Sequence, residues 1–439
     1  MSDEIRVAFV GNIVNNFFRE ASILQNSKGV SCDLFLYHDC NTPNTELPES
    51  DIPGFKYPQW IKHLPEYSRA SILSCFLPKS IARRCFKSFY KLINDLNSYD
   101  LCIFSGPELV ILPFVSTKTV FRATGSDLTV FPVMSFRESN LLRYQSKSLI
   151  ERFKTPLNFL LYYIKRNSYR KGVFNADFID ANESPYIWAL KRLGNIKAKK
   201  LNFFKLAIDT KIFFHYQNNK PFLKKWNLTK KNFIVFMPSR IMISDSYLHK
   251  VTGQWKASDE AIIGFRKFLD KLNNDEKKMV ILVIPDRTRS DELEKAKKLI
   301  QDLKLTENVR FTKGEAEEGL TRSELIELYN CSDVVMDDFG AGWFGSVVVE
   351  SAACGCPILT YVREESMRKK YSWHPFQVAR KSHEISQVME KLYRDYSYRL
   401  LVSEKSINWI NEYHSPSAIK DTYIKNFRAM VVNKGIQNQ

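Results

Sequence analysis

The stretch DDFGAGWFGSVVVESAACGCP, residues 337–357, decides how the second half of the chain is expected to fold. Its glycines Gly340, Gly342 and Gly345 directly follow a short apolar run, and a helical pattern begins at about Ser346. A glycine-rich turn lets backbone N–H groups approach phosphate oxygens, and a helix N-terminus adds unpaired donors and roughly half a positive charge. The stretch therefore predicts a strand, an anion-binding loop and a helix in succession.

Glu350 lies about one turn into the predicted helix. A carboxylate at this place can accept hydrogen bonds from both hydroxyls of a ribose, as acidic residues do in dinucleotide-binding folds. The spacing equally allows a glycine-rich turn that caps an ordinary helix, with Glu350 solvated. The pattern alone does not separate these two interpretations.

Apolar strands and helical patterns alternate along the rest of the chain, which predicts parallel, doubly wound sheets. In the second half, strands are expected at residues 233–237, 279–284, 309–311, 334–336 and 357–361, and helices at 258–272, 291–303, 322–330 and 346–354. In the first half, strands are expected at 5–10, 32–37, 101–104, 119–121 and 178–181, and helices at 17–28 and 184–193.

With 439 residues the chain is too long for one hydrophobic core. We predict an α/β protein with two Rossmann-like domains, at residues 1–207 and 233–408. Residues 208–232, which are polar, basic and interrupted by Pro221, are expected to form the interdomain linker. Residues 409–439 are expected to form a helix that crosses back to the first domain, followed by a tail.

The net charge of +17 indicates an anionic partner. Zinc-finger spacing, an RNA-recognition octamer and a helix-turn-helix pair are all missing from the sequence, so nucleic acid is disfavoured as that partner. The eight cysteines form no CxxC pair, and no metal-ligand cluster is evident. No apolar run is long enough to span a bilayer, and the acidic N-terminus does not resemble a secretory signal. We therefore expect a cytoplasmic protein without a bound metal or cofactor.

Residues 337–357 resemble the donor-site signature of retaining, family-4-like glycosyltransferases with the GT-B fold. The signature has the form E-x7-E, followed by a helix of small residues and G-x-P, and Glu350, Gly355 and Pro357 match it. Further similar segments stand in the family's order: IDTKIFF at 208–214, PSR at 238–240, KASDEAIIGF at 256–265, VILVIPD at 280–286, NVRFTKG at 308–314, LIELYNCSDVVM at 325–336 and WINEYHSP at 409–416. The resemblance implies two Rossmann-like domains facing each other across a cleft, and transfer of a sugar from a nucleoside diphosphate without a metal.

The sequence departs from the family pattern at three places. The first glutamate of E-x7-E falls at Gly342, and neither Asp337 nor Asp338 has the register to replace it exactly. The histidine that precedes Gly-x-Asp in the family is Thr124 here. The insertion between Arg240 and the clamp lysine, residues 241–255, is longer and more polar than is typical. Similar GW(F/Y)G loops occur in some branches of the family, which favours retained activity.

The resemblance also assigns roles to individual residues. Arg240 and Lys256 are expected to stabilise the negative charge that develops on the leaving β-phosphate, together with the backbone N–H groups of Gly345 and Ser346. Asp338, Gly342 and Glu350 complete the expected donor-binding set. The alternatives are a solvated lysine at a helix start for Lys256 and a structural ion pair for Arg240.

In the first domain, Gly11, Asn12 and Asn15 follow the first strand, where acceptor and donor phosphate are expected to meet. Asp127, in the TGSDL segment at 124–128, is expected to bind a sugar hydroxyl or to position the acceptor. Its alternative is an Asx-type turn. Arg122 is a candidate residue for binding an anionic acceptor substrate, and Thr124 lies beside it in the sequence.

Two basic segments of the first domain suggest a further partner. Residues 79–91 contain five Lys/Arg and no acid, and residues 137–172 contain nine Lys/Arg against two acids. Apolar positions between 81 and 96 form one helical stripe, so we predict peripheral docking on an anionic membrane that presents a lipid-linked acceptor. The alternative is a helix packed on its own sheet.

The predicted function is transfer of a sugar to a glycan or lipid-linked acceptor in surface polysaccharide or glycoconjugate synthesis. A GT-B-like protein that binds nucleotide or glycan with weak catalysis is the alternative.

Overall fold

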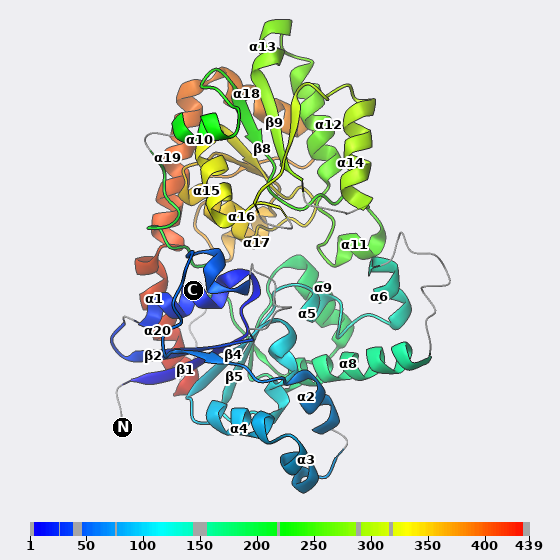
Figure 1. Ribbon diagram of the computed structural model, residues 1–439, viewed down its shortest axis with the longest axis vertical. Helices are drawn as coiled ribbons and strands as arrows, with labels where there is room; N and C mark the ends of the chain where they lie inside the picture. The colour runs from blue at the N-terminus through cyan, green and yellow to red at the C-terminus, as the bar shows by residue number, and fades with distance from the viewer. Residues whose placement is uncertain are drawn as a thin grey trace. The chain divides into compact units, whose positions relative to one another are not determined.

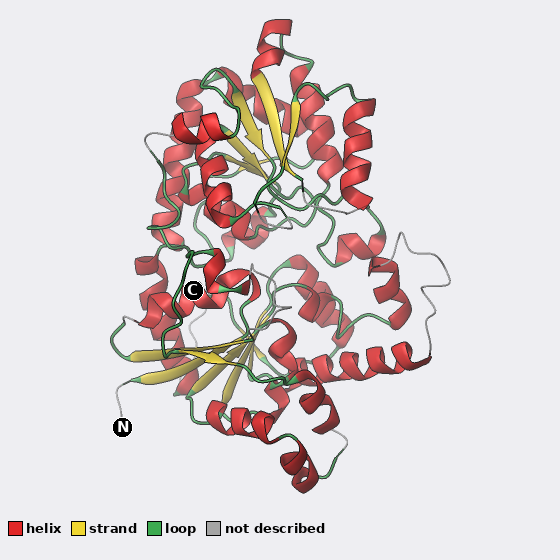
Figure 2. Ribbon diagram, viewed as in Figure 1, coloured by secondary structure: helices red, strands yellow, loops and turns green. Residues whose placement is uncertain are grey.

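The computed structural model describes residues 4–25, 27–37, 46–74, 77–143, 156–216, 220–286, 291–315 and 319–432. The chain divides into two compact units (Figure 1). Unit 1 comprises Met1–Phe204 and Ile419–Gln439, and unit 2 comprises Lys205–Ala418. Each unit contains one sheet with helices around it (Figure 2).

The sheet of unit 1 is entirely parallel, with the strand order β3-β2-β1-β4-β5-β6-β7. Its strands are β1 (Ile5–Val10), β2 (Val30–Leu36), β3 (Ile61–His63), β4 (Leu101–Phe104), β5 (Lys118–Arg122), β6 (Phe178–Asp180) and β7 (Lys199–Lys200). The five predicted strands of this half are confirmed, because each is a buried apolar run. The edge strands β3 and β7 are short, β3 is only partly buried and β7 is exposed, and both lack that signal.

The main helices of unit 1 are α1 (Asn16–Gln25), α2 (Ser68–Ser74), α3 (Lys79–Cys85), α4 (Lys87–Leu96), α5 (Ser126–Thr129), α6 (Phe136–Arg143), α8 (Pro156–Asn175), α9 (Ser184–Leu193) and most of α20 (Pro416–Val431). In the last of these, Tyr423 and Phe427 pack against Phe9, Phe203 and Phe204. The C-terminal helix therefore completes the core of unit 1.

The predicted amphipathic helix at residues 81–96 is two helices, α3 and α4. The chain breaks at Phe86, whose φ of −120° and ψ of 53° are not helical. The apolar side chains of α4, Phe89, Leu92, Ile93 and Leu96, are buried in unit 1. The α4 part of the stripe therefore packs inside unit 1, whereas Ile81 and Cys85 in α3 are exposed.

The sheet of unit 2 is also parallel, with the order β10-β9-β8-β11-β12-β13. Its strands are β8 (Phe233–Phe236), β9 (Val280–Pro285), β10 (Val309–Thr312), β11 (Val334–Met336), β12 (Ile358–Thr360) and β13 (Gln377–Val378). The helices are α10 (Lys220–Lys225), α11 (Tyr247–Val251), α12 (Ser258–Leu269), α13 (Asn274–Met279), α14 (Asp291–Asp302), α15 (Arg322–Cys331), α16 (Ser346–Ala353), α17 (Glu364–Arg368), α18 (Ser382–Arg394) and α19 (Tyr396–Tyr413). All five strands and all four helices predicted for this half are confirmed.

Unit 2 has an apolar core on each face of its sheet. Successive residues of a strand point to opposite faces, and β8 divides accordingly: Ile234 and Phe236 belong to one core, and Phe233 and Val235 to the other. Residues of 208–232 contribute to the first of these cores, where Ile208, Phe213, Leu223 and Leu228 are buried. With this sheet and the one in unit 1, the chain has the two doubly wound, Rossmann-like domains that the sequence predicts.

Candidate functional site

The strand order of unit 2 places a topological switch point between β8 and β11. From β8 the sheet continues through β9 and β10 on one side, and from β11 through β12 and β13 on the other. Ligands of open α/β sheets bind at the carboxyl ends of the strands beside such a point. The loop after β8 contains Ser239 and Arg240, and the loop after β11 contains the glycines. Ser239 Oγ donates a hydrogen bond to Asp337 Oδ1 and so links the two loops.

Asp338 fixes the conformation of the glycine loop. Its Oδ1 accepts hydrogen bonds from the backbone N–H groups of Gly340 and Ala341, at 2.8 and 2.9 Å. Its Oδ2 accepts one from Lys256 Nζ at 3.0 Å. Gly340 has to be glycine, because a Cβ there would lie 2.2 Å from the Trp255 carbonyl oxygen. The predicted donor residues Lys256 and Asp338 therefore form an ion pair that braces the loop.

The same ion pair determines the charge of Lys256. Burial disfavours the charged ammonium, but Asp338 and Asp337 more than offset that cost, and the pKa of Lys256 is raised. Asp337 shows the opposite balance, since burial raises its pKa even though Lys256 acts to lower it. Lys256 is thus a fixed cation, and about a quarter of its side chain, 24%, remains exposed beside the loop.

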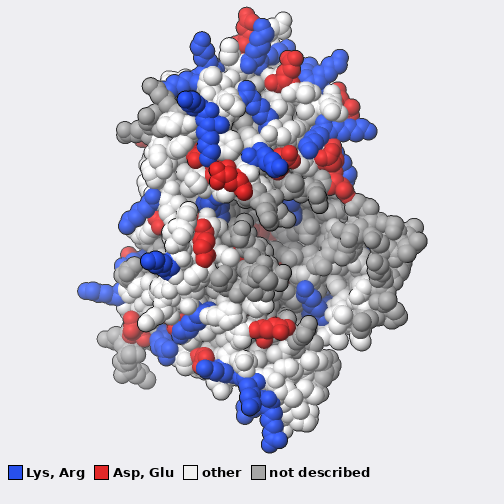
Figure 3. Space-filling model, in the orientation of Figure 1, with Lys and Arg blue, Asp and Glu red and all other residues white. Residues whose placement is uncertain are grey.

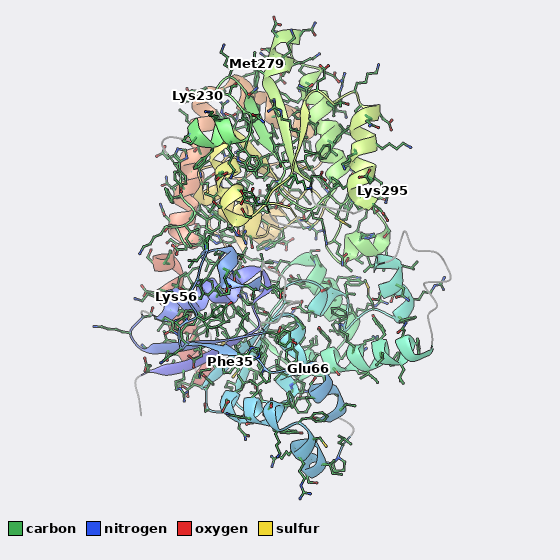
Figure 4. All side chains as sticks on the ribbon, viewed as in Figure 1. Phe35, Lys56, Glu66, Lys230, Met279 and Lys295 are labelled. Carbon is green, nitrogen blue, oxygen red and sulfur yellow. The ribbon has the colours of Figure 1, made fainter. Side chains whose placement is uncertain are left out.

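The insertion between Arg240 and Lys256 is an ordered element that contains α11. Glu292 Oε2 accepts hydrogen bonds from the backbone N–H groups of Ile243 and Ser244, at 2.6 and 2.8 Å. Lys295, which projects from α14 (Figure 4), donates to Glu292 Oε1 at 2.7 Å. Burial raises the pKa of Glu292, but these donors outweigh it and hold the pKa at about 2. The chain segment that carries the exposed side chain of Arg240 is therefore anchored to α14.

Gly345 and Ser346 form the N-terminus of α16, which leads directly out of the glycine loop. No side chain among the described residues caps this helix, and no atom lies within 4 Å of the position that a Cβ on Gly345 would occupy. The exposed first turn of an α-helix offers backbone N–H donors and a partial positive charge to an anion. Of the predicted donor-binding residues, Gly345 and Ser346 are the ones with this open geometry.

Glu350 is more deeply buried than expected, with only 1% of its side chain exposed. Its two carboxylate oxygens accept hydrogen bonds from Arg322 Nη1, at 2.7 and 2.8 Å. Arg322 is itself 9% exposed. In this arrangement the carboxylate joins α15 to α16 inside the domain, so a ribose that used Glu350 would share it with Arg322.

Sequence reasoning missed Arg322, although one signal pointed to its location. Thr321 and Glu324 form a capping box, in which each side chain accepts a hydrogen bond from the backbone of the other residue. That motif fixes Arg322 as the first residue of α15. Its partner is 28 residues away, a relationship that no local pattern reveals.

In unit 1 the switch point lies between β1 and β4. Gly11, which follows β1, has a φ of +95°, and a Cβ there would lie 2.6 Å from Glu108 Oε2. Asn12 and Asn15 are buried and bound to the chain. Asn12 Nδ2 donates to Asn15 Oδ1 and to the Glu46 carbonyl oxygen, at 2.6 and 2.7 Å. Gly11, Asn12 and Asn15 therefore shape this loop, and both amide side chains hold it in place.

Asp127 and Thr124 form a closed hydrogen-bonded turn. Asp127 is 3% exposed, and its carboxylate accepts hydrogen bonds from the backbone N–H and hydroxyl of Thr124 and from the backbone N–H of Gly106. Burial raises the pKa of Asp127, although these donors act to lower it. The carboxylate thus connects the loop after β5 to the loop after β4, and because its donors precede Asp127 in the chain, the arrangement differs from an Asx-type turn.

Arg122 is an internal ion-pair residue in unit 1. Its guanidinium binds Glu20 and also lies 3.7 Å from Asp180, and its side chain is 8% exposed. Burial opposes its charge, but Glu20 and other neighbours raise the pKa of Arg122 well above its ordinary value. Arg122 was a candidate for binding an anionic acceptor substrate. In this arrangement two carboxylates already lie beside its positive charge.

Glu108 is a second residue that sequence reasoning missed. It lies after β4, in the 3-10 helix Gly106–Val110, and is 5% exposed. Its Oε1 accepts a hydrogen bond from the Tyr67 hydroxyl at 2.9 Å, whereas Oε2 has no partner among the described residues. Burial raises the pKa of Glu108 to about 7. A buried acid at a switch point is therefore close to half-protonated at neutral pH.

The structure brings together the predicted residues of each unit at the carboxyl edge of that unit's sheet. In unit 2 these are Arg240, Lys256, Asp338, Gly342, Gly345 and Ser346, with Glu350 in the helix below them. In unit 1 they are Gly11, Asn12, Asn15, Arg122, Thr124 and Asp127. Among the described residues, no group of three or more His, Cys, Asp or Glu side chains is placed to hold a metal ion.

Comparison with known families adds independent information on the same region. The sequence profile of the family described as "Glycosyl transferases group 1" matches residues 255–375. That span contains Lys256, the glycine loop and α16. A comparison with curated proteins found no match.

Several solved structures are similar to the chain over nearly its whole length. Anabaena HepE in complex with UDP and glucose has a TM-score of 0.63 at 13% identity, covering 97% of this chain and all of its own. Sucrose-phosphate synthase from Thermosynechococcus elongatus has a TM-score of 0.58 at 13% identity, with 98% and 100% covered. A glycosyltransferase from Rickettsia africae has a TM-score of 0.56 at 12% identity, with 98% and 100% covered. At this level of identity the likeness shows the fold, and the chain has the two-domain GT-B architecture.

Proposed function

We propose that the protein is a glycosyltransferase that moves a sugar from a nucleoside diphosphate to a glycan or lipid-linked acceptor, with retention and without a metal. The observation that carries the proposal is the glycine loop at the switch point of unit 2, which leads into the uncapped α16 and is braced by Lys256. The glycosyltransferase profile matches this same span. The similar structure of HepE contains UDP and glucose, and a second contains UDP-glucose.

The chemistry follows from the charges at this edge. Transfer breaks the bond between the anomeric carbon and the β-phosphate oxygen, and the bonding electrons stay on the phosphate. The acceptor oxygen forms the new bond to the anomeric carbon, and its proton passes to the departing diphosphate, which has gained the electron pair. Lys256, Arg240 and the backbone N–H groups of Gly345 and Ser346 stabilise the charge on the departing diphosphate. Loss of one preorganised donor of this kind costs about 100- to 1000-fold in rate.

A panel of UDP-, GDP- and ADP-sugars tests the proposal, with release of the nucleotide and the mass of the product as readouts. Lys256→Ala should lower the turnover by about 100- to 1000-fold. Asp259→Ala, in the first turn of α12, should leave it nearly unchanged. Wild-type turnover in the lysine variant would show that Lys256 does not act on the leaving group.

A second candidate is a protein that binds nucleotide or glycan with little catalysis. Two observations favour it: Gly342 stands where the signature has its first glutamate, and the Glu350 carboxylate is bound to Arg322. Such a protein would bind a nucleotide in a thermal-shift assay, because a bound ligand stabilises the native state. It would release no nucleotide from any sugar donor and acceptor mixture.

We further propose that unit 1 associates with an anionic membrane surface and thereby reaches a lipid-linked acceptor. Helix α8 exposes Phe159, Leu160 and Leu161, each more than 50% accessible. Figure 3 shows Lys and Arg side chains on the end of unit 1 where α3 and α4 lie. Each basic residue near an anionic surface contributes about 1 kcal/mol of attraction. None of the described helices is both long enough and apolar enough to cross a membrane, so the proposed association is peripheral.

Sedimentation with vesicles that contain anionic lipid tests this association. Wild-type protein should sediment at low salt, and replacing Phe159, Leu160 and Leu161 together by Ser should abolish sedimentation. Replacing the buried Leu92 by Ala is the contrasting variant, which should lower stability and leave binding intact. Equal binding of the wild type and the α8 variant would refute the role of α8. Residues 144–155 of the basic segment lie outside the described residues.

A further inference from the structure

Two arginines lie at the carboxyl edge of unit 2, on the side of the glycine loop away from β8. Arg363 follows β12, and Arg380 follows β13, the next strand in the sheet. The backbone N–H of Arg363 donates to the Gly342 carbonyl oxygen at 3.0 Å. Arg380 Cζ lies 4.8 Å from the centroid of the Tyr361 ring, which itself borders Gly342. The two guanidinium groups therefore flank one point of the loop.

Arg363 occupies the space that a side chain at position 342 would need. A Cβ on Gly342 would lie 2.8 Å from Arg363 Cγ, 2.9 Å from Arg363 Nε and 3.0 Å from Tyr361 Cε1. Gly342 also has a φ of +77°, which favours glycine. The E-x7-E pattern would place a carboxylate at position 342. This chain has a glycine there, and the side chain of Arg363 packs against its backbone. The charge at this part of the loop is thus reversed.

Two carboxylates next to Arg363 in the chain have other partners, and a third, Glu384, binds the backbone beside Arg380 and lies within reach of its charge. Glu364 binds His374 at 3.1 Å, and Glu365 binds Lys369 at 3.0 Å. Glu384 Oε2 accepts hydrogen bonds from the backbone N–H groups of residues 380 and 381. Within the described part of the chain, no carboxylate forms an ion pair with the guanidinium of Arg363 or of Arg380, and both side chains are exposed.

The positions of these arginines separate them from the groups proposed to bind the diphosphate. Lys256 binds Asp338 at the start of the loop, directly after β11, whereas Arg363 and Arg380 follow β12 and β13. A guanidinium group presents a planar fork of donors that matches a carboxylate in two parallel hydrogen bonds. A second anionic group, attached next to the diphosphate, would satisfy this pair.

We propose that Arg363, with Arg380 beside it, binds a carboxylate on the donor sugar, so that the donor is a nucleotide-linked acidic sugar such as a hexuronate. This inference rests on the proposed function, since it places the donor at the glycine loop. It adds a specificity-determining residue and the chemical class of the sugar.

Matched pairs of donors test the proposal, because they differ only in whether the sugar carries a carboxylate or a hydroxymethyl group. Calorimetry first establishes whether UDP or GDP binds the full-length protein. The affinities for UDP-glucuronate and UDP-glucose, or for GDP-mannuronate and GDP-mannose, are then compared. A hydrogen-bonded charge pair should make the acidic member bind about 10- to 100-fold more tightly.

Three variants connect that preference to the arginines. Arg363→Met should lower the preference to near unity, Arg363→Glu should reverse it, and Arg380→Met should lower it partly. Lys230→Met, at an exposed lysine in a distant turn of unit 2 (Figure 4), is the control and should keep the wild-type ratio. Melting temperatures of all variants establish that each is folded.

The outcomes separate the two proposals. If UDP or GDP binds and the two members of its pair bind equally, the acidic-sugar inference is wrong and the proposed function stands. A preference that survives in Arg363→Met and Arg363→Glu would also overturn it. If neither UDP nor GDP binds, the acidic-sugar inference fails, and the proposed function fails as well only if the ADP-sugars of the panel are not turned over either.

Discussion

Arg322 binds both carboxylate oxygens of Glu350 through one nitrogen, at 2.7 and 2.8 Å, and so joins the first residue of α15 to the middle of α16. Both partners are almost completely buried, with 9% and 1% of their side chains exposed. Helix α16, which follows the glycine loop, is therefore held in place by an ion pair inside the domain.

Breaking this pair should destabilise the protein strongly, because the remaining charge would stay buried without its partner. Arg322→Met is expected to lower the free energy of unfolding by about 3–5 kcal/mol. Lys225→Met removes an ion pair with Glu327 whose lysine is 42% exposed, and should cost about 1 kcal/mol or less. Chemical denaturation measures both. Similar losses in the two variants would show that burial does not set the value of the pair.

Gly342 and Gly345 offer a comparison within one loop. Gly342→Ala should cost about 1–3 kcal/mol, since position 342 has a positive φ and its Cβ would meet Arg363. Gly345→Ala should change stability by about 0.5 kcal/mol or less, because its φ of −118° suits alanine and the space beside it is open. In the double variant with Arg363→Ala, part of the loss at Gly342 should be recovered. Strict additivity would contradict the close contact.

Asp338 is expected to have two separable effects on nucleotide binding. Asp338→Asn keeps the Oδ1 acceptor for the N–H groups of Gly340 and Ala341 but removes a negative charge beside Lys256. Its affinity for a nucleoside diphosphate should rise roughly fivefold, about 1 kcal/mol for one unit charge at this range. Asp338→Ala also loses the hydrogen bonds that shape the loop, and should bind more weakly than the asparagine variant. Calorimetry with UDP and GDP measures the order, and the reverse order would refute the bracing role of Oδ1.

Glu108 should make stability depend on pH. Its pKa is raised from 4.5 to about 7 by burial, so between these values the folded state binds more protons than the unfolded state. Stability is therefore lost as the pH rises through this window, by about 3 kcal/mol in total at 1.36 kcal/mol per pKa unit. Glu108→Gln has no such loss, and its stability relative to wild type should increase from pH 4.5 to pH 8. A difference independent of pH for Glu108→Gln would contradict the assignment.

The strands of both sheets were predictable because each central strand is a short, buried, apolar run. The runs at 5–10, 101–104 and 334–336 coincide with β1, β4 and β11. The loop and helix at 337–353 followed from the glycines after β11. The stripe at 81–96 was predicted as one helix but forms α3 and α4, because Phe86 gives no signal of the break between them. The burial of the α4 part was not predictable, since an amphipathic pattern looks the same on a membrane and on a sheet.

The partners of individual charged residues were not predictable. Arg122 and Glu20 are separated by 102 positions, and Arg322 and Glu350 by 28. Local pattern identifies which residues reach the carboxyl edge of a sheet, but the packing of whole helices decides which charges meet. For this reason the sequence placed Arg122 and Glu350 at the edges of their sheets without showing that each already has a counter-ion.

The packing of Phe427 against Phe9 has a consequence for how the protein is made. Unit 1 is built from both ends of the chain, whereas unit 2 is a single continuous stretch. During synthesis the segment that closes the core of unit 1 leaves the ribosome after the whole of unit 2, so unit 2 can finish folding before unit 1 does. Until then Phe9, Phe203 and Phe204 lack their aromatic cover, and a chain truncated before Ile419 would keep that apolar surface exposed and prone to aggregation.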